Sequence, residues 1–141
     1  LARTIVEERK NGVIETSEQL KDLLKPHLFR GKENKILAQI YQAIRIEVNQ
    51  EIEVLKEFLQ QTEEVIRKDG RLSLISYHSL EDRLVKRYIR SGLFEGEPEK
   101  DMYGNIDVPF RKTSGLIIPS RDEIKQNNRA RSAKLRVARK L

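Results

Sequence analysis

The segment GRLSLISYHSLEDRLVKRYIR, residues 70–90, decides the fold of this 141-residue chain. Gly70 stands where a glycine commonly ends a helix. Arg71 to Tyr77 is a short segment in which apolar and polar residues partly alternate. This pattern predicts a strand. Ser79 can then cap a second helix that runs to about Arg90. A helix, a glycine, a buried strand and another helix form one unit of a doubly wound α/β sheet.

A single strand cannot form a sheet, so the remaining strands of this sheet must come from elsewhere. Upstream, apolar residues from Ile36 to Ile66 recur at three- and four-residue spacing. This spacing predicts one long helix, or two helices with a bend near Asn49. Two shorter helices are predicted before it, one from Leu1 to Lys10 and one that starts near Thr16.

Downstream of the deciding segment, residues 92–108 are rich in Gly, Glu and Asp and predict a loop. A strand is predicted from Phe110 to Ile118, and a capping box at residues 120–123 predicts a short helix. The tail from Arg129 to Leu141 predicts a final strand with one buried face and one basic face. The expected buried face holds Ala133, Leu135 and Val137, and the expected opposite face holds Lys134, Arg136 and Ala138.

The composition favours a polyanionic partner. The formal net charge is +6 and the pI is about 9.6, although a basic solvated surface explains the charge equally well. Without cysteine, the chain has no disulfide scaffold, thiolate zinc site or cysteine nucleophile, which fits a reducing cytoplasm. No apolar run approaches the roughly 18 residues of a membrane span, and residues 1–10 do not form a signal peptide. A metal site is not expected.

Three segments together resemble one family. They are YQAIRIEVNQEI at residues 41–52, GRLSLISYHSLEDRLVK at residues 70–86, and PSRDEIKQNNRARSAKLRVA at residues 119–138. In this order and spacing they resemble the C-terminal part of the MraW family, the ribosomal RNA small subunit methyltransferases H. The family usually has Phe where Tyr77 stands and Pro where Asn128 stands, and both departures are mild.

The resemblance implies an α/β fold: the C-terminal half of a Rossmann-like, S-adenosylmethionine-dependent methyltransferase sheet, plus the end of an inserted helical substrate-recognition domain. By this analogy residues 1–42 end the inserted domain, and residues 43–141 form the second half of the catalytic domain. The implied reaction moves a methyl group from S-adenosylmethionine to N4 of a cytidine in the decoding region of 16S ribosomal RNA. The implied partner is that RNA or the small ribosomal subunit.

The family's glycine-rich loop for the methyl donor is expected to precede Leu1, so we expect no cofactor-binding residues in this chain and no activity of the chain alone. Gly92 and Gly96 do not form such a loop, because they neither follow a strand nor open a helix. The chain begins at Leu1 in a sequence typical of the middle of a helix, which also suggests a truncated protein.

The acceptor pocket is predicted to contain Asn49, His78 and Ser79. A cytosine amino group is a poor nucleophile, so its N–H needs a hydrogen-bond acceptor, which Asn49 or His78 can supply. His78 also follows the predicted strand, where open α/β sheets build their sites. Each residue has a structural alternative: Ser79 as a helix cap, His78 as a hydrogen-bonded structural histidine, and Asn49 at a helix bend.

Basic residues that could contact RNA phosphates occur in three places. Phosphate contacts position RNA without reading its sequence, and a solvated basic face is the alternative. The predicted RNA-binding residues are Lys35, Arg45, Arg83, Lys86, Arg129, Arg131 and Lys134.

Two other classes of function compete with the enzyme. A non-catalytic basic helical module that binds RNA or DNA suits the charge, but it leaves the predicted strands without partners. A dimerisation element built on the stripe from Ile36 to Ile66 lacks a sustained heptad. The sequence leaves the oligomeric state open.

Overall fold

A computed structural model describes all residues from Leu1 to Leu141. The chain forms two compact units, Leu1–Asn49 and Gln50–Leu141, which are described separately below. The domain boundary expected after residue 42 concerns the organisation of a longer enzyme and stays a prediction. No helix in either unit combines the length and the apolar character that a membrane crossing requires.

The first unit is entirely helical. It contains α1 (Ala2–Glu8), α2 (Ser17–Leu24), the 3-10 helix η1 (Lys25–His27) and α3 (Glu33–Val48). Thr16 and Gln19 form a capping box at the start of α2, where the sequence predicts that a helix begins. The Tyr41 hydroxyl on α3 donates a hydrogen bond to the Ser17 carbonyl at 2.9 Å. The buried apolar residues of this unit are Leu20, Leu24 and Leu37.

The apolar stripe from Ile36 to Ile66 forms two helices, so the second alternative drawn from the sequence is confirmed. The helix α3 ends at Val48, and α4 spans Glu51–Val65. Gln50 between them adopts a left-handed conformation with φ of 51°, which interrupts the helical path.

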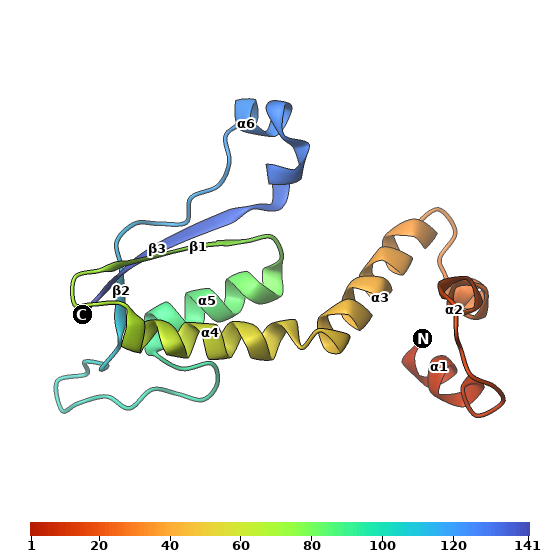
Figure 1. The fold of residues 1–141 in the computed structure, drawn as a ribbon, viewed down its shortest axis with the longest axis horizontal. Coiled ribbons are helices and arrows are strands. Elements are labelled where there is room, and N and C mark those ends of the chain that lie inside the picture. The colour runs from red at the N-terminus through yellow and green to blue at the C-terminus, as the bar shows by residue number, and fades with distance from the viewer. The chain divides into compact units, whose positions relative to one another are not determined.

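The second unit is built on a three-stranded sheet with the order β1-β3-β2 (Figure 1). The strands are β1 (Arg71–Ser76), β2 (Phe110–Lys112) and β3 (Lys134–Lys140). β3 is antiparallel to both neighbours, so β1 and β2 run parallel to each other. The strand and the helix predicted within residues 70–90 are confirmed as β1 and α5 (Ser79–Ser91).

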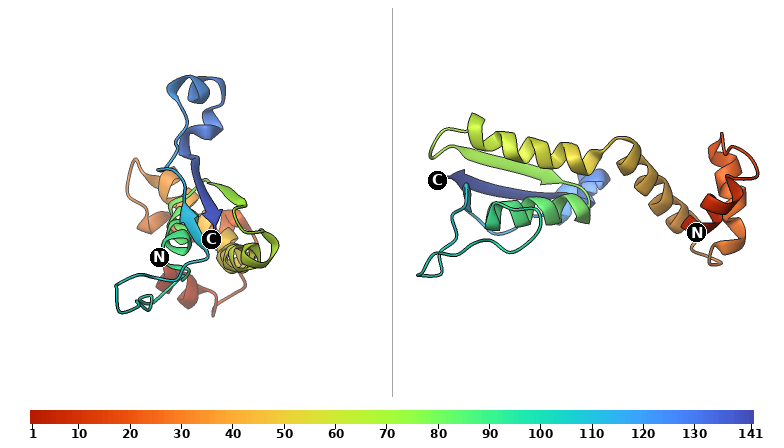
Figure 2. Two further views of the ribbon diagram at one scale, coloured as in Figure 1. Left: turned by 90° about the vertical axis from the view of Figure 1, so that its left-hand side faces the viewer. Right: turned by 90° about the horizontal axis from the view of Figure 1, so that it is seen from below.

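One face of this sheet carries the core of the unit. The helices α4 and α5 lie side by side beneath the strands, as two views show (Figures 1 and 2). The Tyr88 ring stacks on the Phe94 ring with centroids 4.8 Å apart, and Phe110 packs beside it. The buried apolar cluster consists of Leu59, Leu72, Val85, Tyr88, Ile89, Phe110 and Ala138.

The opposite face of the sheet has no covering layer. Ile75 on β1 is 60% exposed, and Ile117, which pairs with Leu135 beside β3, is 44% exposed. Strand β1 is also an edge strand, since β3 is its only partner. Apolar side chains on one face and an unpaired strand edge are features that globular proteins normally cover.

The C-terminal tail differs from its prediction in two ways. First, the final strand begins at Lys134 rather than Arg129. Residues Asn128–Ser132 instead form the 3-10 helix η2, in which the Asn127 side chain caps the Arg129 N–H. The short helix predicted at this position is α6 (Arg121–Gln126), where the Ser120 side chain accepts from the Glu123 N–H at 3.1 Å.

Second, the predicted buried face of the final strand is wrong. Ala138 is fully buried, whereas Leu135 and Val137 are only half-buried. The register pairs Ala138 with the buried Leu72 and places Arg136 opposite Leu74, so the helix-covered face takes the even-numbered residues. Arg136 is accommodated there because a carboxylate of α5 neutralises it, as described below.

The strand predicted from Phe110 to Ile118 is also shorter than expected. Regular pairing ends at Lys112, and the Ser114-Gly115 turn separates it from the single bridge between Ile117 and Leu135. Because this turn interrupts the hydrogen-bonded ladder, the segment pairs with β3 at two short, separate places and does not form one continuous strand.

Candidate functional site

The candidate site lies where β1 ends and α5 begins. His78 is the N-cap residue of α5, with extended backbone angles, and Ser79 is the first residue of the helix. The structural role proposed for Ser79 from the sequence, the helix cap, therefore belongs to His78. The His78 side chain is 18% exposed, so its ring is largely enclosed but reachable.

The carboxylate of Glu81 holds this turn in place. Its Oε2 atom accepts hydrogen bonds from the Tyr77 N–H at 2.9 Å and the His78 N–H at 3.3 Å. Its Oε1 atom lies 3.4 Å from Nε2 of His78. Three interactions with one carboxylate fix both the backbone of the turn and the orientation of the imidazole ring.

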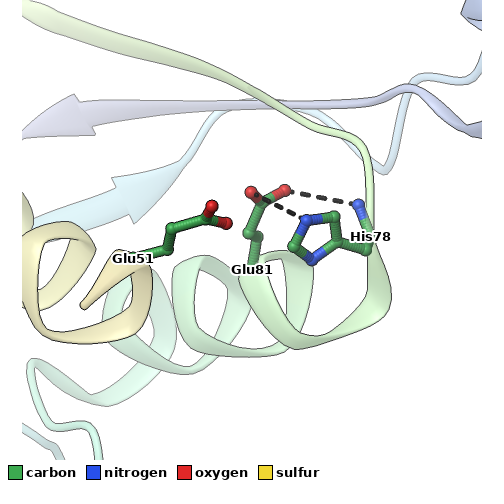
Figure 3. Close-up of side chains that lie close together, drawn as sticks. All are labelled: Glu51, His78 and Glu81. Carbon is green, nitrogen blue, oxygen red and sulfur yellow. Dashed lines mark hydrogen bonds and ion pairs between the residues drawn. The ribbon is translucent and has the colours of Figure 1, made fainter. Parts of the chain in front are cut away.

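A second carboxylate approaches the same point. Glu51, in the first turn of α4, brings a carboxylate oxygen to within 4.8 Å of the His78 and Glu81 donor atoms. Figure 3 shows the Glu81 carboxylate between the Glu51 side chain and the His78 ring. A histidine and two carboxylates are also ligand types that bind divalent metals. The position of the Glu81 carboxylate, however, is already explained by its hydrogen bonds to the backbone.

Neither Glu51 nor Glu81 is among the site residues that the sequence predicts. The sequence signal for Glu81 is its position three residues after the N-cap, where a carboxylate reaches back to the backbone. No comparable signal marks Glu51, because its proximity to His78 arises from the packing of α4 on α5.

One atom of the imidazole ring lacks a partner. His78 Nδ1 is buried and makes no hydrogen bond. A neutral ring that donates from Nε2 to Glu81 leaves a free lone pair on Nδ1. This free lone pair can accept a hydrogen bond, and this property suits a group that meets a substrate N–H.

Asp82 anchors the site to the sheet. Its carboxylate accepts from Arg136 on β3 at 2.7 Å and 3.1 Å and lies 3.4 Å from the Lys134 ammonium group. The hydrogen bond from Arg136 outweighs the effect of burial and lowers the pKa of Asp82. Asp82 forms its ion pairs with Arg136 and Lys134 of β3 and none with Lys86 on its own helix.

The predicted site residues fall in both units. Asn49 is the exposed C-cap residue of α3 and closes the first unit, so its placement beside His78 stays a prediction. Lys35 and Arg45 are exposed on α3. Within the second unit, Arg83 and Lys86 are exposed on α5, and Arg129 and Arg131 are exposed on η2. Lys134 is half-buried and its ammonium group is engaged by Asp82.

The residues present do not fit the methyl-donor site of a nucleotide-binding sheet. Such a site needs a glycine-rich turn between a strand and a helix, where backbone N–H groups approach the ligand closely. The turn from β1 to α5 consists of Tyr77 and His78 and contains no glycine. The arrangement can hold and orient a hydrogen-bonding substrate group, but it offers no cradle for a nucleotide-like cofactor.

Comparison with known proteins agrees with the resemblance. The family model described as the MraW methylase family matches residues 1–141. Proteins named ribosomal RNA small subunit methyltransferase H are similar over the whole chain: 86% identical in Christiangramia forsetii, 63% in Flavobacterium johnsoniae and 48% in Parabacteroides distasonis. The chain spans 47% of the length of each of these relatives. We conclude that the chain belongs to the MraW methylase family.

Proposed function

We propose that the full-length protein containing this chain transfers a methyl group from S-adenosylmethionine to N4 of a cytidine in the decoding region of 16S ribosomal RNA. In this proposal the chain supplies the wall that receives the cytidine. The observation that carries the assignment is the His78–Glu81 pair at the carboxyl end of β1, in a chain of a methylase family. A ribosomal substrate also fits a cytoplasmic location.

The chemistry of the acceptor explains why these side chains are suitable. The lone pair of the cytosine amino group is delocalised into the ring, so the nitrogen becomes nucleophilic only when its N–H bonds are held by acceptors. Asn49 offers a carbonyl oxygen, and His78 offers a ring nitrogen. The carboxylates of Glu51 and Glu81 beside His78 would stabilise the positive charge that develops on the nitrogen. The base must also leave its stack to reach them.

The exposed surfaces of the sheet support a larger catalytic domain. An unpaired β1 edge and the exposed apolar residues Ile75 and Ile117 are where further strands and helices of a methyltransferase sheet would join. We infer that residues outside this chain bind the methyl donor, whose sulfonium group activates the methyl for transfer. The alternative of a non-catalytic RNA- or DNA-binding module has no observation of its own in its favour.

The proposal is tested by identifying the product. The full-length protein, incubated with S-adenosylmethionine and small ribosomal subunits or 16S RNA, is expected to produce N4-methylcytidine in the decoding region. Nuclease digestion and mass spectrometry would locate the methyl group on the base and in the sequence. A methyl group found only on another atom or on another RNA would refute the proposed specificity.

A second prediction concerns the chain alone. Titration calorimetry of residues 1–141 with S-adenosylmethionine is expected to show no binding, because the chain has no glycine-rich donor loop. The full-length protein serves as the positive control in the same buffer. Saturable binding to the isolated chain, with a stoichiometry near one, would show that the donor site lies within these residues.

A further inference from the structure

A cavity of about 380 Å³ lies in the second unit between α5, β2, β3 and the turn at Ser114-Gly115. The residues that line it include the apolar Ile89, Phe110 and Val137. The volume falls within the range of roughly 300 to 1,000 Å³ that is typical of small-molecule sites. The cavity is therefore large enough to enclose a group of the size of a nucleobase.

The mouth of this cavity is lined by cations that have no acidic partner. Lys86 and Arg90 on α5 and Arg111 and Lys112 on β2 are exposed, and none of them forms an ion pair or a hydrogen bond within the chain. The fifth cation, Arg136, is engaged by Asp82. No carboxylate lines the cavity, so four positive charges surround an apolar space without compensation.

The second cavity of the unit shows that this arrangement is more than a consequence of the basic composition. It lies near the loop after α5, and four acidic residues and one basic residue line it: Glu63, Glu97, Glu99, Asp107 and Lys140. Acidic residues thus predominate in this cavity and basic residues in the first. Such separation focuses a positive potential on the first cavity, which attracts anionic ligands.

The basic cavity is separate from the candidate acceptor site. Lys86 and Arg90 follow His78 by eight and twelve residues along α5, which corresponds to about 12 to 18 Å at 1.5 Å per residue. The cavity also borders β2, at the edge of the sheet opposite β1. A ligand there would not displace the residues proposed to hold the cytidine.

We propose that this cavity binds an unstacked nucleotide of the RNA strand that flanks the target cytidine. The base lies against the apolar walls, and the phosphates on either side contact the four unpaired cations. Single-stranded RNA is the preferred occupant because its bases can be splayed out of the stack and its backbone tracks a positive groove. The inference rests on the proposed function, which identifies the ligand as ribosomal RNA. It adds the location on the protein where this RNA binds.

The test uses the full-length protein and a fluorescein-labelled single-stranded fragment of 16S RNA that contains the decoding region. The double variant R111E/K112E reverses two of the four charges on exposed side chains of β2. We expect the Kd for RNA to rise about tenfold or more, and the slope of log K against log salt to fall by about 1.4 for two lost phosphate contacts.

The matched control is R67E/K68E, which reverses the same pair of residue types on exposed positions of the same unit, away from the cavity. Leu116→Ser, at a lining residue that is 43% exposed, removes apolar surface without changing the charge, so it tests the contact with the base separately and should also weaken binding. If R111E/K112E weakens RNA binding no more than R67E/K68E, the proposal is wrong. Tight binding to phosphatidylglycerol vesicles that depends on Arg111 and Lys112, with unchanged RNA binding, would also overturn it.

The two proposals fail in different ways. Normal RNA affinity and normal methylation by R111E/K112E would overturn the cavity assignment and leave the proposed function intact. Absence of N4-methylcytidine with the unaltered protein would overturn the proposed function, while the comparison of RNA affinities would still decide whether the cavity binds RNA.

Discussion

Replacing His78 with alanine in the full-length protein is expected to lower kcat for cytidine methylation by about 100-fold or more, the usual effect of removing one group that stabilises developing charge. Asn49→Ala is expected to have an effect of similar size. In both cases the substrate N–H loses its hydrogen-bond acceptor at the moment when the nitrogen attacks the methyl group. Steady-state methylation of small subunits, measured with radiolabelled donor, gives kcat and KM separately, and the loss should appear mainly in kcat.

Since His78 also caps α5, the structural contribution has to be separated from the chemical one. His78→Ser keeps a good N-cap residue but removes the ring, so it should restore the stability lost in His78→Ala without restoring kcat. His27→Ala is the matched control, because His27 is the only other histidine and belongs to the first unit. Turnover close to normal in both Asn49→Ala and His78→Ala would remove these residues from the acceptor site.

The local elements of the fold could be predicted because their signals are local. A change of apolar period at Gly70 marks β1, and the break near Asn49 follows from an asparagine at the end of a long stripe. The capping box at α2 and the Ser120 cap of α6 depend on residues three positions apart. In each case, neighbours in the sequence supply most of the hydrogen bonds that define the element.

The face of β3 could not be predicted for the opposite reason. Alternation in the tail is compatible with either face, and the choice depends on the pairing of Ala138 with Leu72, sixty-six positions earlier in the chain. The sequence alone gives no reason to place a charged residue such as Arg136 on a covered face. It is stable there because Asp82, on a helix fifty-four residues earlier, neutralises its charge. The same dependence on packing explains why Glu51 was missed at the candidate site.

Replacing Asp82 is therefore expected to have a large effect on stability. Asp82→Asn keeps the shape of the side chain but leaves Arg136 without its carboxylate partner, at a position where the Arg136 side chain is only 18% exposed. Removing one partner of a fully buried pair costs about 3 to 5 kcal/mol, and partial access of water reduces this to about 2 to 3 kcal/mol here. Urea unfolding of the chain at pH 7, analysed by linear extrapolation, measures the difference.

The pH dependence gives an independent check on the cause. Because Arg136 and Lys134 lower the pKa of Asp82 in the folded state, the charged carboxylate contributes stability above its unfolded pKa of about 3.9. That contribution disappears as the pH falls through the lower folded pKa, so the difference between the unaltered chain and Asp82→Asn should shrink in acid. Asp122→Asn, which breaks an exposed pair with Lys125, should change stability by less than about 1 kcal/mol. A difference for Asp82→Asn that is equally small, or that stays constant with decreasing pH, would show that the ion pair does not hold α5 against β3.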